Sequence, residues 1–270
     1  MSASFAWSIY TGENPYMSWA KILDCGNAPL TFLDNTVALR QLEKAHKVSD
    51  SVELNSQCPR VQVCGITLHR LLNPNTRLQA IIAWPKVISG RQAKAKEKSL
   101  VPRIITLGGD HTGVNHGTFL HIAHEEGLIQ NSSIHAGIRA PLIRRKGDIR
   151  NDLRCGFDTI KSRDIDRIGV DGVIERLKTR VGNNNVYISV DIDVLDPAFG
   201  PATGTPEAGG WSSRELLSIL DGLEGINVVG ADVVEVAPIY DNPGETTVLA
   251  GAEIVQSFLR LMVQNPVKTL

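Results

Sequence analysis

The strongest constraint on the fold is an alternation of short apolar runs with helical patterns along the second half of the sequence. Four runs rich in β-branched residues predict strands, at 103–107, 133–138, 186–192 and 226–236. Helical patterns lie at 172–181, 213–223 and 247–262. Strands that read as continuous apolar runs are buried on both faces, so the sequence predicts an α/β fold with a mostly parallel sheet. Ligands of such sheets bind beyond the carboxyl ends of the strands.

The composition fits one large globular domain and argues against several classes of partner. A chain of 270 residues with 42% hydrophobic residues can bury a full core. The formal net charge of −1 gives no long-range field that would favour nucleic acid or an anionic membrane. The 4 scattered cysteines predict free thiols, and no apolar run approaches the roughly 20 residues that span a bilayer. We expect a cytoplasmic protein without nucleic-acid or membrane partners.

Two carboxylates mark the end of the predicted strand 186–192. Asp191 and Asp193 are two residues apart, so on a strand their side chains point to the same face. Two such carboxylates repel each other unless a cation, a proton or an arginine lies between them. A hard divalent metal ion is one occupant, because it prefers carboxylate oxygens. A salt-bridged structural pair is the other reading of the spacing.

Three further polar residues stand near predicted strand ends. His111 follows two glycines that let the backbone approach a ligand, although a loop histidine bonded to Asp110 explains it equally well. His116 is a candidate proton shuttle or a residue at a helix entry. Glu235 ends an apolar strand, and burying it without a cation would be costly. We therefore expect an internal arginine or a cationic substrate to face Glu235.

Read together, "LGGDHT", "SVDIDVLDPAFGPATGTPEAGGW" and "DVVEVAP" resemble the ureohydrolases, the arginase and agmatinase family, and the agmatinase-like branch most closely. The resemblance implies a three-layer arginase-like α/β fold and a homo-oligomer. It implies hydrolysis of a linear guanidino compound, agmatine or guanidinobutyrate, to urea and an amine, as in polyamine metabolism. Members of the family use two Mn²⁺ ions, whose activated hydroxide attacks the guanidinium carbon.

The resemblance also implies roles for individual residues. His111, Asp191 and Asp193 match metal ligands of the family, and Asp191 matches the ligand that lies between the two ions. His116 matches a histidine that assists proton transfer to the leaving amine. Glu235 matches the acid that faces the guanidinium, which agrees with the cationic partner expected there.

The sequence departs from the family pattern in two places. Members carry a strand ending in Asp-x-His-x-Asp between the "GGDH" and "NHG" motifs, whereas only residues 112–114 separate the two motifs here. This predicts that one internal strand–helix unit is missing, that one Mn²⁺ or none is held, and that activity is impaired. An inactive metal-binding or oligomer-forming relative is the alternative. Residues 48–86 interrupt a stretch that is continuous in the family, so we expect a single domain, 1–270, in which 48–86 is a non-family insertion.

Overall fold

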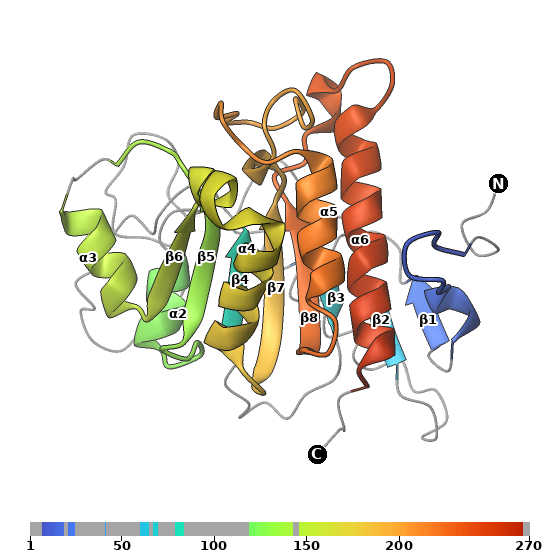
Figure 1. The fold of residues 1–270 in the computed structure, drawn as a ribbon, viewed down its shortest axis with the longest axis horizontal. Helices are drawn as coiled ribbons and strands as arrows, with labels where there is room; N and C mark the ends of the chain where they lie inside the picture. Colours follow the sequence, from blue (N-terminus) through green and yellow to red (C-terminus); the bar gives the residue numbers. More distant parts are fainter. Residues whose placement is uncertain are drawn as a thin grey trace.

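The computed structural model describes residues 7–18, 21–24, 41, 60–64, 67–69, 79–83, 119–142 and 146–266. Its strands form one eight-stranded sheet in the order β1-β2-β3-β8-β7-β4-β5-β6 (Figure 1). The strands are β1 Lys21–Asp24, β2 Arg60–Cys64, β3 Thr67–His69, β4 Gln79–Ala83, β5 Ser133–Ile138, β6 Phe157–Lys161, β7 Asn185–Asp191 and β8 Asn227–Val234. Neighbouring strands are parallel except where β3 pairs with β2 and β8. The predicted α/β fold with a mostly parallel sheet is confirmed.

The three predicted helices, 172–181, 213–223 and 247–262, are all present, and the described part of the chain has further helices that these patterns did not predict. The helices are α2 Phe119–Glu125, α3 Gly147–Arg154, α4 Ile165–Val181, α5 Ser213–Gly222 and α6 Thr246–Gln264. The predicted helix 172–181 is the second part of α4, which has a break in its helical backbone at Gly169. At the start of α5, Ser212 Oγ accepts a hydrogen bond from the Glu215 amide, and the Glu215 carboxylate accepts one from the Ser212 amide. This reciprocal pairing satisfies two amides that a helix start otherwise leaves unpaired.

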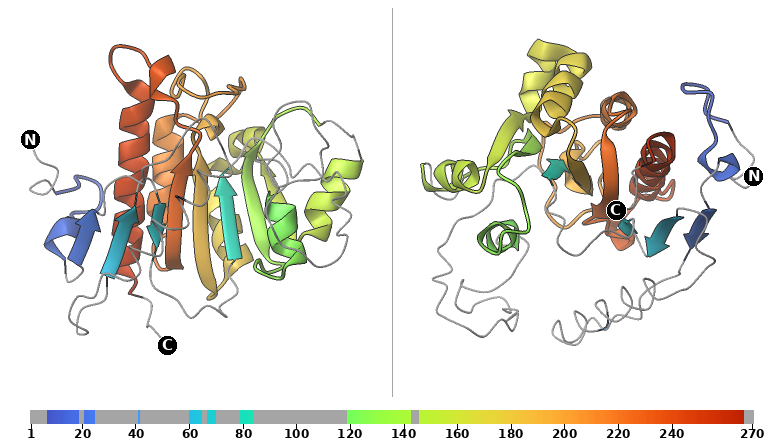
Figure 2. Two further views of the ribbon diagram at one scale, coloured as in Figure 1. Left: turned by 180° about the vertical axis from the view of Figure 1, so that it is seen from behind. Right: turned by 90° about the horizontal axis from the view of Figure 1, so that it is seen from below.

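Helices cover both faces of the sheet and form three layers with it. α4, α5 and α6 lie on one face (Figure 1), and α2 lies on the other when the molecule is seen from below (Figure 2). On β7, the fully buried Val186, Ile188 and Val190 alternate with Tyr187 and Ser189. The three aliphatic residues belong to the main hydrophobic core, which also contains the inner faces of α4, α5 and α6. The polar residues of β7 therefore share the opposite face of the sheet.

The segment 48–86 contributes three strands to the described part of the chain. β2 and β3 join the β1 end of the sheet, and β4 lies between β7 and β5, parallel to both. The sequence "QAIIA" of β4 is a short apolar run, which suits a central strand with neighbours on both sides. The origin of residues 48–86 as a non-family insertion stays a prediction. The missing strand–helix unit and the predicted strand 103–107 fall in 101–118, outside the described residues.

Helix α6 is long and apolar enough, by length and composition alone, to cross a membrane. Its inner face, with Ile254, Phe258 and Met262, is buried in the main core and packs against α5 and β8. Arg260 on the same helix is 5% exposed and pairs with Asp221 of α5 at 2.6 Å. These contacts are those of a core helix, as the apolar stripe in the sequence predicts.

Candidate functional site

The two aspartates singled out in the sequence lie together at the carboxyl end of β7. Asp191 is the last residue of that strand, and Asp193 lies in the 3₁₀ turn η4, Ile192–Val194, so the strand ends one residue before the predicted end. The residues are 3% and 1% exposed, and the Asp193 amide donates a hydrogen bond to Asp191 Oδ1 at 3.1 Å. The turn thus keeps both acids at one edge of the sheet.

The electrostatics of the pair favour a bound cation. Burial raises the pKa of Asp191 to about 9, and the neighbouring carboxylates of Asp193 and Glu235 add to this effect. A buried carboxylate beside other acids is stable in its ionised form only when positive charge offsets the lost hydration. The described structure therefore meets the first requirement of a site for a hard divalent ion, which is a set of oxygen donors in need of positive charge.

Glu235 is the third acid of this edge. It follows the end of β8 at Val234 and contributes to the raised pKa of Asp191, which places it near the pair. Its side chain is exposed and its backbone is left-handed, with φ of 63°. The cost of burying Glu235, on which the sequence argument for a cationic partner relied, does not arise, because the side chain is exposed directly after β8. An exposed acid needs no internal arginine and is open to a cation from solution.

The loop that follows Asp193 folds back, so that its end at Trp211 pairs with its beginning. The Asp196 amide donates to the Trp211 carbonyl at 2.9 Å, and the Trp211 amide donates to the Val194 carbonyl at 3.1 Å. A Cβ added at Gly210 would lie 2.3 Å from the Asp196 amide nitrogen, so only glycine fits between the two paired segments. The glycine and proline residues of the long sequence motif thus close a compact loop beside the acid pair.

Two groups near the aspartates were not identified from the sequence. On β8, Asp232 accepts hydrogen bonds from the hydroxyls of Tyr187 and Ser189, both at 2.6 Å, and burial raises its pKa. Arg139 follows β5 and reaches the backbone of η4. A signal for Arg139 did exist, since a basic residue directly after a buried strand lies at the carboxyl edge of the sheet.

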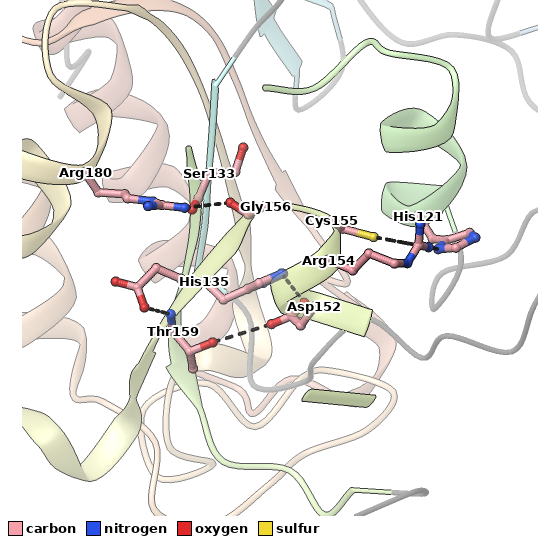
Figure 3. A network of polar contacts seen from close by, with 10 residues as sticks. His121, Ser133, His135, Asp152, Arg154, Cys155, Gly156, Thr159 and Arg180 are labelled. Atoms are coloured by element: carbon pink, nitrogen blue, oxygen red, sulfur yellow. Dashed lines mark hydrogen bonds and ion pairs between the residues drawn. The ribbon is translucent and has the colours of Figure 1, made fainter. Parts of the chain in front are cut away.

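A second buried polar group lies two strands away and is not part of this edge. His135 of β5 is fully buried, and its Nε2 lies 3.1 Å from Asp152 Oδ1 of α3 (Figure 3). Thr159 of β6 donates to the same carboxylate at 3.4 Å, and the imidazole stacks on Phe157 with ring centroids 4.2 Å apart. These contacts tie α3 to β5 and β6.

The two predicted histidines, His111 and His116, lie outside the described residues, and their roles stay predictions. Within the described ranges, no three histidine, cysteine or acidic side chains gather closely enough to hold a metal ion. Asp191 and Asp193 nevertheless fit part of a divalent-metal shell, because carboxylate oxygens are ligands of Mg²⁺, Mn²⁺ and Ca²⁺. The remaining ligands would come from other segments of the chain, and His111 is the ligand that the sequence predicts there.

Comparison with known proteins relates the chain to one family. The profile of the Arginase family matches residues 110–260. Two Schizosaccharomyces pombe proteins with the provisional names agmatinase 1 and agmatinase 3 are 40% and 38% identical to this chain over 94% of its length. A crystal structure of a hypothetical agmatinase from Burkholderia thailandensis superposes with a TM-score of 0.54 at 33% identity, over 70% of this chain and 52% of that one.

The alignments also show a difference in length. The chain spans 67% and 64% of the two S. pombe relatives. The first alignment runs over 296 residues, which exceeds the 270 residues of this chain, so it contains gaps opposite residues that the relative has and this chain lacks. The matching profile begins at Asp110, next to His111, and includes Asp191, Asp193 and Glu235.

Proposed function

The chain belongs to the arginase family, and from this premise we propose that it is an agmatinase-like hydrolase. Its substrate would be a linear guanidino compound such as agmatine or guanidinobutyrate, and its products urea and an amine. The observation that carries the proposal is the cluster of Asp191, Asp193 and Glu235 at the carboxyl end of β7 and β8. The names of the S. pombe and B. thailandensis relatives support it.

The cluster combines a metal-binding part with a part suited to a cationic substrate. Asp191 and Asp193 would hold Mn²⁺, which is a general trait of the family, and their burial keeps competing water away. When bound, the ion would lower the pKa of a water molecule and so supply a strong nucleophile at neutral pH. Glu235 is exposed beside this pair and would accept hydrogen bonds from the guanidinium, a pairing strengthened by the opposite charges.

The hydrolysis at this edge forms one bond, breaks another, and moves the two protons of the attacking water to the leaving nitrogen. The oxygen of water bonds to the guanidinium carbon, and the bond from that carbon to the alkyl-bearing nitrogen breaks. The leaving nitrogen needs a proton to depart as an amine, and His116 is the predicted group that delivers it. Glu235 would meanwhile hold the two terminal nitrogens that remain in urea.

The alternative function is that of an inactive relative that binds metal or forms oligomers. The absence of Asp-x-His-x-Asp from the sequence and the gapped alignment with a longer relative favour it. Two carboxylates and one histidine are fewer ligands than a pair of ions needs. Under this alternative, Mn²⁺ binds at Asp191 and Asp193 but urea is not released.

Urea release from agmatine and from 4-guanidinobutyrate, measured with added Mn²⁺ and with a metal count per chain, tests both functions. We expect Asp191→Asn to abolish release and metal retention, with Asp232→Asn as the control at a second buried carboxylate. Glu235→Gln should raise KM for the substrate, whereas Glu245→Gln, at another exposed glutamate with left-handed backbone, should not. Retained metal without urea would favour the inactive relative, and activity that survives Asp191→Asn would refute the proposed site.

The assembly and location of the chain are further parts of the proposal. We expect a cytoplasmic homo-oligomer, as the family resemblance implies. Ile239, Tyr240 and Leu249 are 87%, 66% and 58% exposed and are apolar side chains that a second copy of the chain could cover. Light scattering after size-exclusion chromatography measures the assembly, and a monomer at micromolar concentration would contradict this part.

A further inference from the structure

We propose that Arg139 is a positioning residue of the candidate metal site. Its guanidinium holds the backbone of Asp193 against the loop that carries Glu207, and so presets the Asp193 carboxylate for a divalent cation. The inference rests on the proposed function of Asp191 and Asp193, and it adds a residue that neither the family match nor the sequence motifs identify.

The hydrogen bonds of Arg139 all end on backbone carbonyls. Its Nε and Nη2 donate to the Glu207 carbonyl at 3.0 and 2.6 Å. Its Nη1 donates to the Val194 carbonyl at 3.3 Å, and Nη2 also donates to the carbonyls of Asp193 and Leu195. A planar guanidinium presents several N–H groups at fixed angles, so one side chain can hold several carbonyl groups at once. The turn that contains Asp193 is thereby fixed to a loop more than ten residues further along the chain.

The backbone of β5 is shaped to direct Arg139 toward this turn. Gly137 has a φ of 87°, and the pairing of β5 with β6 shifts its register between Ala136 and Ile138. A β-bulge of this kind re-aims the side chains that follow it. A Cβ at Gly137 would lie 2.4 Å from Val194 Cγ2, so the missing side chain lets η4 approach β5. The approach brings the carbonyls of η4 within reach of Arg139.

The arrangement leaves the carboxylates to other partners. Burial lowers the pKa of Arg139, while the charges of Asp193 and Glu207 oppose that shift, so the guanidinium stands near the acids. Because its N–H groups are directed at carbonyls, Arg139 supports the position of Asp193 without occupying the carboxylate oxygens. Groups that orient a metal ligand in this way typically change metal affinity about 10- to 100-fold when they are removed.

Arg180 provides a matched control at the opposite end of the same strands. Its Nε donates to the Ser133 carbonyl at 3.1 Å, and its Nη2 donates to the Gly156 carbonyl at 2.8 Å (Figure 3). Nη2 also donates to the Asn131 carbonyl at 3.1 Å. Ser133 begins β5 and Gly156 directly precedes β6, so these bonds fix the amino ends of the strands. Both arginines contribute to stability, but only Arg139 contacts the metal-ligand turn.

The test measures Mn²⁺ binding by the full chain, with free Mn²⁺ followed by electron paramagnetic resonance. We expect Arg139→Gln to weaken binding about 10- to 100-fold, as loss of an orienting group does. Arg180→Gln should leave it within about twofold, the scatter expected for a distant independent site. Arg139→Lys should lie between Arg139→Gln and the unsubstituted chain, because one ammonium cannot reach the separated carbonyls together. Amide hydrogen exchange over 192–210 should accelerate in Arg139→Gln and not in Arg180→Gln.

Each outcome supports or overturns the positioning role of Arg139. Equal losses of Mn²⁺ affinity in the glutamine variants of Arg139 and Arg180 would show a merely structural role and overturn the inference. Unchanged affinity in Arg139→Gln, with Asp193→Asn binding no metal, would overturn the inference alone. An unsubstituted chain that binds no Mn²⁺ would overturn the proposed function and the inference together. If Arg139→Gln does not fold, Arg139→Lys and Arg180→Lys are compared by the same criteria.

Discussion

Replacing Gly137 with alanine should destabilise the chain strongly, because two independent costs meet at this position. Its φ of 87° lies in the left-handed region, where a Cβ costs roughly 1 to 2 kcal/mol. The new Cβ would also lie 2.4 Å from Val194 Cγ2, inside a core in which overpacking costs roughly 1 to 3 kcal/mol. We therefore expect Gly137→Ala to lower the free energy of unfolding by about 2 to 5 kcal/mol.

Urea denaturation of the metal-free chain separates the two costs. Gly225 has a φ of 89° and nothing within 4 Å of an added Cβ, so Gly225→Ala reports the backbone cost alone. Val194→Ala removes the methyl groups that cause the clash at Gly137. The double variant Gly137→Ala/Val194→Ala should thus be more stable than the two single losses predict, by the steric part of about 1 to 3 kcal/mol.

Two results would refute this reasoning. If Gly137→Ala cost no more than Gly225→Ala, the close approach of Val194 would not be real. If the losses at Gly137 and Val194 simply added, the clash would have another source. Gly137→Ala should also lower the affinity for Mn²⁺, because a shift of η4 moves the carbonyls that Arg139 holds.

The remaining predictions concern buried charges. Because the folded pKa of Asp191 is raised to about 9, its contribution to stability is full below the unfolded pKa of about 3.9 and is lost as pH rises to about 9. Asp191→Asn should therefore raise the melting temperature of the metal-free chain at pH 7. It should also make the fall of the melting temperature between pH 4 and pH 9 less steep. The prediction is contradicted if the melting temperatures of the variant and of the unsubstituted chain fall in parallel over this range. Asp232→Ala should destabilise more than Asp232→Asn, by roughly 1 to 3 kcal/mol in urea denaturation, since alanine leaves the Tyr187 hydroxyl without its acceptor. Asp221→Ala should lower the stability more than Arg260→Met, because the first leaves the buried Arg260 guanidinium without its carboxylate and the second replaces Arg260 with an apolar side chain. Equal losses in calorimetry would argue against a partly buried ion pair.

The sequence predicted those parts of the molecule that depend on local signals. Strand β7 was recognisable because a run rich in β-branched residues ends in two acids, and α5 because Ser212 and Glu215 form a capping box. The placement of Asp191 and Asp193 at one edge followed from the parallel sheet. The strand and the helix start depend on residues close together in the sequence, where periodicity and capping are informative.

The parts that escaped prediction depend on contacts between distant segments. No local pattern indicates that β4 lies between β7 and β5, because strand order is decided by which buried faces meet. Arg139 gives no sign in the sequence that its partners are carbonyls of residues 193–195 and 207. The apolar run before Glu235 likewise does not show that its side chain is exposed, with a left-handed backbone, directly after β8.

The structure narrows the alternatives that the sequence left for the aspartate pair. A cation, a proton or an arginine could satisfy two adjacent carboxylates, and an arginine does lie beside them. Within the described part of the chain, Arg139 directs its five hydrogen bonds to carbonyl groups and not to the carboxylates of the pair. The raised pKa of Asp191 favours a proton on the pair when no metal ion is bound. A divalent cation would displace that proton while Arg139 keeps the turn in place, which is why removing Arg139 should weaken metal binding without removing a ligand.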